Sequence, residues 1–79
     1  MNVWILQIRE CSDDPVATDQ VYLFTSQDKA EQSAYRQLWD YAEWRVEDPE
    51  TLPESLEELG EMVGNNEWGC YSIYTAEVK

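Results

Sequence analysis

Apolar residues near the start of the chain recur with the two-residue period of a β-strand. The segment from Val3 to Arg9 is apolar on both faces of the predicted strand. One face carries Trp4, Leu6 and Ile8, and the other carries Val3 and Ile5. Because both faces are apolar, this strand is expected in the centre of a sheet rather than at its edge. A second strand is predicted from Gln20 to Thr25.

The next segment has the period of an amphipathic helix, running from Gln27 to about Val46. Its predicted buried side consists of Ala30, Ala34, Leu38, Tyr41 and Ala42. The opposite side consists of Lys29, Gln32, Arg36, Asp40 and Glu43. Thr25-Ser26 can cap the start, because a hydroxyl there accepts from a backbone N–H of the first turn. Glu47-Asp48-Pro49 is expected to break the helix.

A second helix is predicted with Pro53 in its first turn. Its apolar stripe consists of Leu52, Leu56, Leu59 and Val63. Gly64-Asn65-Asn66 is expected to end it. Gly60 costs roughly 1 kcal/mol relative to alanine inside a helix, so its presence indicates close packing. A last strand is predicted from Trp68 to Val78.

These elements predict a single α+β domain over residues 1–79 with the order ββααβ. The first two strands form a hairpin, and the last strand most simply returns to pair with the first. The expected sheet is antiparallel with strand order 2-1-3, and both helices pack on one of its faces.

Composition restricts the partners that the domain can have. Seventeen acidic residues oppose five basic ones, giving a net charge of −12. Phosphate contacts need Lys and Arg, so direct binding to nucleic acid or to an anionic membrane is not expected. The start of the chain lacks the basic region of a signal peptide, and no apolar run approaches a membrane span. The expected location is the cytoplasm.

The sequence offers little catalytic chemistry. It contains no His, which removes the usual general base, and its three Gly do not form a phosphate-binding loop. Asp13, Asp14 and Asp19 cluster but lack the spacing of an EF-hand. Two Cys without His do not make a zinc site. We therefore expect a binding protein rather than an enzyme, with no cofactor or metal.

Acidic residues concentrate in the second half of the chain, where Asp40 to Glu67 holds ten acids and one base, Arg45. Four of these acids fall on the outer face of the second helix: Glu54, Glu57, Glu58 and Glu61. Glu50 extends the row if the helix starts early. Carboxylates three or four positions apart lie about 5–6 Å from one another, close to the spacing of successive phosphates. This surface can therefore imitate a nucleic-acid backbone, or it can be an ordinary solvated face.

Further candidate contact residues flank this row. They are Glu47, Asp48 and Trp44 near the end of the first helix, and Asp13 and Asp14 in the loop between the first two strands. A three-stranded sheet covered on one face also leaves the other face open. That face carries either Trp4, Leu6 and Ile8 or Val3 and Ile5, and Tyr22 or Tyr74 can join it. It can be covered by the termini and the 10–20 loop, bind a partner, or form a homodimer.

The two cysteines, Cys11 and Cys70, are brought toward each other by the expected sheet order. A disulfide between them is conceivable, but a cytosolic setting favours two ordinary small residues that are buried or half-buried.

In size, acidity, lack of catalytic residues and surplus aromatics, the whole chain resembles small phage-encoded inhibitors of host defence, including anti-CRISPR proteins and nucleic-acid mimics. The stretch from Leu52-Pro53-Glu54 through Glu57-Glu58 to Gly64-Asn65 is similar to the acidic helix of the uracil-DNA glycosylase inhibitor, although the order of elements elsewhere differs. That resemblance implies that Glu54, Glu57, Glu58 and Glu61 contact the partner.

The expected function is therefore that of an acidic inhibitor that occupies a basic nucleic-acid-binding protein, such as a CRISPR effector subunit, and blocks DNA access. If the chain is phage-encoded, this would occur in the host cytoplasm. The alternative is a small homodimeric accessory module without an inhibitory role.

Overall fold

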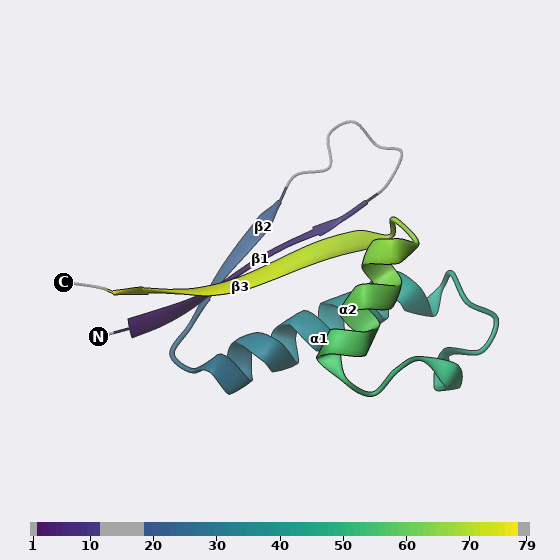
Figure 1. The fold of residues 1–79 in the computed structure, drawn as a ribbon, viewed down its shortest axis with the longest axis horizontal. Helices are drawn as coiled ribbons and strands as arrows, with labels where there is room; N and C mark the ends of the chain where they lie inside the picture. Colours follow the sequence, from purple (N-terminus) through teal and green to yellow (C-terminus); the bar gives the residue numbers. More distant parts are fainter. Residues whose placement is uncertain (1, 12–18, 78–79) are drawn as a thin grey trace.

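The computed structural model describes residues 2–11 and 19–77 and contains the predicted ββααβ order. The elements are β1 (Asn2–Glu10), β2 (Gln20–Phe24), α1 (Gln27–Glu43), a short 3-10 helix η1 (Pro49–Thr51), α2 (Leu56–Asn65) and β3 (Gly69–Glu77). The three strands form one antiparallel sheet in the order β2-β1-β3 (Figure 1). The predicted fold class and strand order are confirmed.

The central place of β1 follows from its two apolar faces. Ile5 lies opposite Leu23 on β2 and Tyr74 on β3, which fixes the register of both pairings. Leu6 and Ile8 point to the other face, where they are fully buried. They form one core with residues of both helices: Ala34, Leu38, Ala42, Leu59 and Val63. Both helices therefore cover the same face of the sheet.

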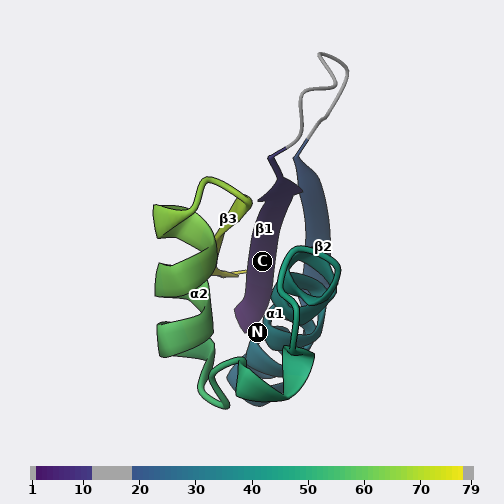
Figure 2. The same cartoon turned by 90° about the vertical axis from the view of Figure 1, so that its right-hand side faces the viewer.

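The two helices cover different parts of the sheet. α1 contacts all three strands, whereas α2 packs against α1 and β3 (Figure 2). The buried positions of α1 follow a spacing of four residues, and all of its predicted outer residues are exposed. The amphipathic pattern thus determined how α1 is oriented.

Helix α1 begins where predicted but ends three residues early, at Glu43 rather than Val46. Ser26 caps the start, because its Oγ accepts from the backbone N–H of Lys29 at 3.3 Å. At the other end the backbone N–H of Arg45 donates to Ala42 O, a shorter turn than that of an α-helix. The Arg45 guanidinium instead donates to the carbonyl oxygen of Tyr41, the group that a continuing helix would have bonded to the Arg45 backbone.

The prediction that Pro53 lies in the first turn of α2 was wrong, because the helix begins at Leu56. Ser55 is the N-cap, and its Oγ accepts from the backbone N–H of Glu58 at 3.1 Å. Pro49 is instead the first residue of η1, and Asp48 is the N-cap of that short helix. The sequence pattern predicted neither. Leu52 is buried as expected but lies outside the helix. Serine followed three residues later by glutamate is the signal that marks the true start.

The end of α2 lies near the predicted position but uses another residue. Trp68 N–H donates to Val63 O and Glu67 N–H to Gly64 O, the two bonds of a Schellman motif. The left-handed residue of this motif is Glu67, with φ of 59°, and not Gly64. Gly60 does mark close packing, because a Cβ there would lie 2.5 Å from Cε1 of Tyr71.

Candidate acidic binding surface

A groove opens between α1 and the segment that leads into α2. Its lining consists of Asp28, Glu31, Gln32, Tyr35, Glu54 and Leu56. The groove is shallow and open to solvent, with a volume of about 430 Å³. Three of its six lining residues are acidic, and Tyr35 and Leu56 provide the apolar part of the wall. We refer to it as the acidic groove.

Both walls of the acidic groove are positioned by local structure. On α1, Asp28, Glu31 and Tyr35 are spaced three and four residues apart and therefore share one side of the helix. The other wall is the segment before α2. It is held in place because the hydroxyl of Tyr35 on α1 donates to the carbonyl oxygen of Pro53 at 2.8 Å. This bond ties the chain before α2 to α1. Glu54, the next residue, lines the groove together with Asp28 and Glu31 of α1.

The carboxylates of the groove have no cationic partner within residues 2–11 and 19–77. The salt bridges in this part of the chain join Arg9 to Asp19 and Arg45 to Glu10. Glu31 accepts a hydrogen bond from the side chain of Gln27 at 3.0 Å, which is a neutral donor. The groove therefore carries a net negative charge that a ligand can neutralise.

Negative charge continues from the groove toward β3. The pKa of Tyr71 is raised above its usual value, first by burial of the phenol and then by the charges of Glu57 and Glu31. Each of these effects disfavours the phenolate. Glu31 on α1 and Glu57 on α2 thus act on the same phenol and belong to one region of negative potential.

The predicted row of acids on α2 is shorter than expected. Glu57, Glu58 and Glu61 lie on the helix and are exposed. Glu54 precedes the helix and lines the acidic groove instead. Glu50 belongs to η1, so it does not extend the row.

The other predicted contact residues have separate places. Glu47 and Asp48 are exposed in the connection between α1 and η1, and an Asp48 carboxylate oxygen accepts from the backbone N–H of Glu50 at 3.1 Å. Asp13 and Asp14 lie outside the described residues. Sequence reasoning missed Asp28 and Glu31. Their spacing on one side of α1 was visible, but their proximity to Glu54 depends on the packing of two elements.

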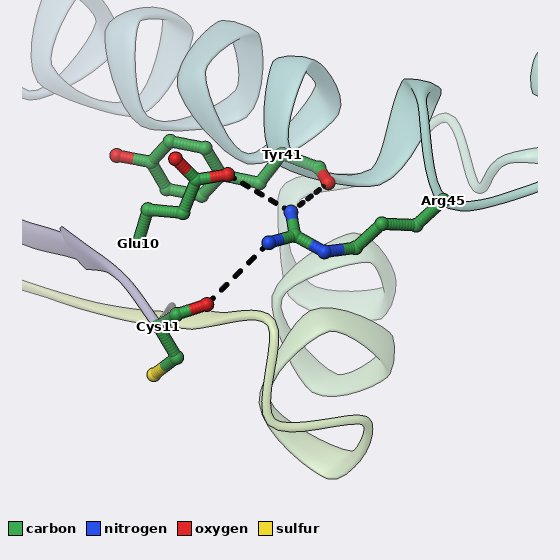
Figure 3. A network of polar contacts seen from close by, with 4 residues as sticks. All are labelled: Glu10, Cys11, Tyr41 and Arg45. Atoms are coloured by element: carbon green, nitrogen blue, oxygen red, sulfur yellow. Dashed lines mark hydrogen bonds and ion pairs between the residues drawn. The ribbon is translucent and has the colours of Figure 1, made fainter. Parts of the chain in front are cut away.

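Trp44 lies at the end of α1 and is 69% exposed. The next residue, Arg45, holds the helix to the sheet. The guanidinium of Arg45 lies 3.9 Å from the centre of the Trp44 ring. Its Nη1 donates to Glu10 Oε2 at 2.9 Å and to Tyr41 O, and its Nη2 donates to Cys11 O at 3.4 Å (Figure 3). The one base between Asp40 and Glu67 is thus used to hold α1 against the end of β1, and it does not neutralise the groove.

Tyr41 lies beside this network, on the covered face of the sheet. The pKa of its phenol is raised, mainly by burial and next by the negative charge of Glu10. Both effects disfavour the phenolate, so the phenol stays neutral to a higher pH than that of an exposed tyrosine.

The face of the sheet opposite the helices carries exposed apolar side chains. Val21, Leu23 and Tyr74 are 58%, 67% and 47% exposed. Because side chains alternate along a strand, the β1 residues on this face are Val3 and Ile5, and Tyr74 rather than Tyr22 accompanies them. The alternative face of β1 carries Leu6 and Ile8 and is the covered one.

The two cysteines are free, as favoured from the sequence. Cys11 is half-buried as expected, but Cys70 is exposed, because it lies opposite Arg9 on the face of the sheet that the helices do not cover. Cys11 follows β1, and its backbone N–H donates to Trp68 O at 2.9 Å. The expected approach of these chain segments is therefore present without a disulfide.

The described residues contain no group of three or more acidic or thiol side chains arranged to hold a metal ion. No helix in the described ranges is long and apolar enough to cross a membrane. Comparisons of the chain with protein-family models, with curated proteins and with solved structures gave no match.

Proposed function

We propose that this domain is an acidic inhibitor that occupies the basic nucleic-acid-binding surface of another protein and so blocks DNA access. The observation that carries the proposal is the acidic groove, in which Asp28, Glu31 and Glu54 surround an open volume. A basic side chain of the partner supplies the missing counter-charge.

The groove matches the chemistry of a lysine or arginine side chain. Such a side chain has an apolar stem and a charged end. Tyr35 and Leu56 offer apolar surface to the stem, and the carboxylates accept hydrogen bonds from the charged end. Hydrogen bonds between ionised groups are about twice as strong as neutral ones. The groove therefore selects a cationic partner over a neutral one.

The surrounding charge favours the same class of partner. The chain has a net charge of −12, and Glu57, Glu58 and Glu61 are exposed on the neighbouring helix. A field of one sign steers an oppositely charged surface into contact and accelerates association at low salt. Proteins that bind nucleic acid present such basic surfaces. A CRISPR effector subunit is one target of this class that can be tested directly.

The proposal is tested by competition for DNA. Fluorescence anisotropy of labelled DNA bound to a purified basic target, with a CRISPR effector subunit as the first case, measures displacement by the inhibitor. The double variant Glu31→Lys with Glu54→Lys is expected to weaken displacement at least tenfold, which corresponds to about 1.4 kcal/mol. Glu57→Lys with Glu58→Lys tests the adjoining helix in the same way.

The matched control is Glu43→Lys with Glu77→Lys, which makes the same charge change at exposed positions outside the groove. It is expected to slow association at low salt but to leave most of the affinity. If the groove variant displaces DNA as well as the native protein does, the acidic groove is not the contact surface. If the native protein displaces DNA from no basic target, the inhibitor proposal fails.

A further inference from the structure

The uncovered face of the sheet differs from the rest of the molecule in charge. We call it the open sheet face, and its positions are Val3, Ile5, Gln7 and Arg9 of β1, Val21 and Leu23 of β2, and Cys70, Ser72, Tyr74 and Ala76 of β3. Its apolar part centres on a row of three residues, Leu23, Ile5 and Tyr74, that lie directly opposite one another in the sheet. Two of these three are among the exposed large hydrophobic side chains of the described chain.

Within residues 2–11 and 19–77, the open sheet face is close to electroneutral. Arg9 lies on it, and its Nε is 3.6 Å from Oδ1 of Asp19, the residue that precedes β2. Asp19 also accepts a hydrogen bond from the side chain of Gln7 at 2.9 Å. The strand acids Glu10 and Glu77 fall on the opposite parity, toward the helices. One opposite-charge pair therefore occupies a face of a molecule whose net charge is −12.

This charge distribution favours a second copy of the chain over a basic partner as the occupant of the face. A basic partner gains nothing from a surface without net charge, and it is attracted to the acidic helices on the other side of the sheet. A second copy repels the first through its acidic surfaces but not through this face. The same face of another copy is a neutral apolar surface of this kind, and pairing of identical patches is the commonest arrangement in homo-oligomers.

We propose that two copies of the chain associate through their open sheet faces to form a symmetric β-sandwich. Stacked sheets pack about 10 Å apart, so the helices of both copies remain on the outer surfaces. The two acidic surfaces are then separated by both sheets, a distance greater than the Debye length of about 8 Å at physiological ionic strength. Leu23, Ile5 and Tyr74 of each copy form the centre of the contact.

The small size of the face is consistent with a weak dimer. A nine-residue strand such as β3 is about 30 Å long, and three strands span roughly 14 Å. The projected area is therefore on the order of 400 Å² per copy, against about 800 Å² per partner in a standard interface. The dimer is expected to be weak and to dissociate on dilution.

Dimerisation makes binding through the acidic groove bivalent. This consequence rests on the function proposed above. A dimer presents two acidic grooves on opposite outer surfaces, so it can bind two basic sites that are joined in one target or assembly. Such bivalent binding increases avidity without new contacts. The dimer itself does not depend on this use.

The experiment is sedimentation equilibrium of the purified protein from about 10 µM to 1 mM, a range chosen for a weak interface. The native chain is expected to shift from monomer to dimer within this range, and added salt is expected to strengthen the dimer because it screens repulsion. Leu23→Glu and Leu23→Lys are both expected to weaken dimerisation at least tenfold. Leu23 is 67% exposed, so neither variant should prevent folding.

Two comparisons make the result specific. Leu23→Lys reduces the net negative charge and Leu23→Glu increases it, so a weaker dimer in both variants cannot come from the change in the net charge of the molecule. Thr75→Glu places one new charge at an exposed position on the other face of the same sheet, and it should dimerise like the native chain at high salt. A protein that is monomeric throughout, or a dimer unaffected by both Leu23 variants, overturns the proposal.

Failure of this proposal is distinguishable from failure of the inhibitor proposal. The oligomeric state is measured on the isolated chain without any target. The monomeric Leu23→Lys variant keeps the acidic groove, and it should therefore still displace DNA with unchanged affinity for each copy on a target with a single site.

Discussion

Gly60 and Gly64 lie one turn apart in α2 and have different surroundings. A Cβ at Gly60 would lie 2.5 Å from Cε1 of Tyr71, whereas a Cβ at Gly64 would meet nothing within 4 Å. Both residues are helical, since neither has a positive φ. One glycine is therefore required by packing, and the other costs helix stability without a contact to justify it.

This difference predicts opposite effects of one substitution. Gly64→Ala is expected to stabilise the protein by about 0.5–1 kcal/mol, because alanine is the better helix former. Gly60→Ala is expected to destabilise it by about 1–3 kcal/mol, because the ring of Tyr71 must move. Urea unfolding followed by circular dichroism measures both. A Gly60→Ala variant as stable as the native protein would mean that the α2–β3 contact is looser than the structure shows, and a destabilising Gly64→Ala would contradict the second expectation.

The contact between α2 and β3 also affects the titration of Tyr71. The pKa of Tyr71 is raised by burial, by Glu57 and by Glu31. In the unfolded chain this phenol titrates near 10. Its contribution to stability is therefore fully present below pH 10 and is lost as pH rises through the higher pKa of the folded state.

Glu57→Gln is expected to lower the pKa of Tyr71 toward its usual value, although burial keeps the pKa raised. The phenolate absorbance followed during an alkaline titration measures this change. Glu58→Gln is the control, because it removes the same charge from the next position and Glu58 is not among the groups that raise the pKa of Tyr71. Equal effects of both variants would show a general field rather than the local contact of α2 with β3.

The elements differ in how far the sequence predicted them. α1 was predicted well because its apolar positions repeat over several turns and Ser26 marks its start. Its end was set by Arg45, whose side chain takes the place of a backbone donor. The start of α2 was missed because Pro53 and Ser55 are both acceptable at a helix start. The apolar stripe begins at Leu52, before both residues, so the sequence pattern does not show which of the two start signals the helix uses.

The candidate site was predicted only in part, because it depends on tertiary contacts. Glu54 was identified from its spacing on an assumed helix, but its neighbours in the groove are Asp28 and Glu31, more than twenty residues earlier. The open face of the sheet could not be chosen either. Val3 and Ile5 are as apolar as Leu6 and Ile8, so only the packing of the helices distinguishes the two faces.

For the whole molecule, the net charge of −12 is a source of instability as well as a means of binding. Most of the described acids are exposed and are not in salt bridges, so they repel one another across the helical side. Salt screens this repulsion and should stabilise the fold.

Raising sodium chloride from about 10 mM to about 0.5 M is expected to increase Tm by several degrees, because the Debye length falls from about 30 Å to less than 8 Å. A change of this size corresponds to about 1 kcal/mol in a domain of this length. Thermal unfolding at low protein concentration measures it without a contribution from dimerisation. Glu58→Lys with Glu61→Lys should show a smaller increase, and an unchanged or lower Tm in high salt would contradict the expectation.

The strand order β2-β1-β3 has a consequence for the way the chain reaches its fold. The pairing of β1 with β3 joins Asn2 to Glu77, so almost the whole described chain lies within the loop that this pairing closes. During synthesis β1 is made before both helices and before β3, and its covered face has to wait for them. Pairings between distant segments slow folding because loop closure comes before the contacts that compensate for it. The central strand β1 is therefore among the first segments to be synthesised and among the last to form all of its native pairings. A ribosome-bound chain that ends before β3 should lack the native sheet.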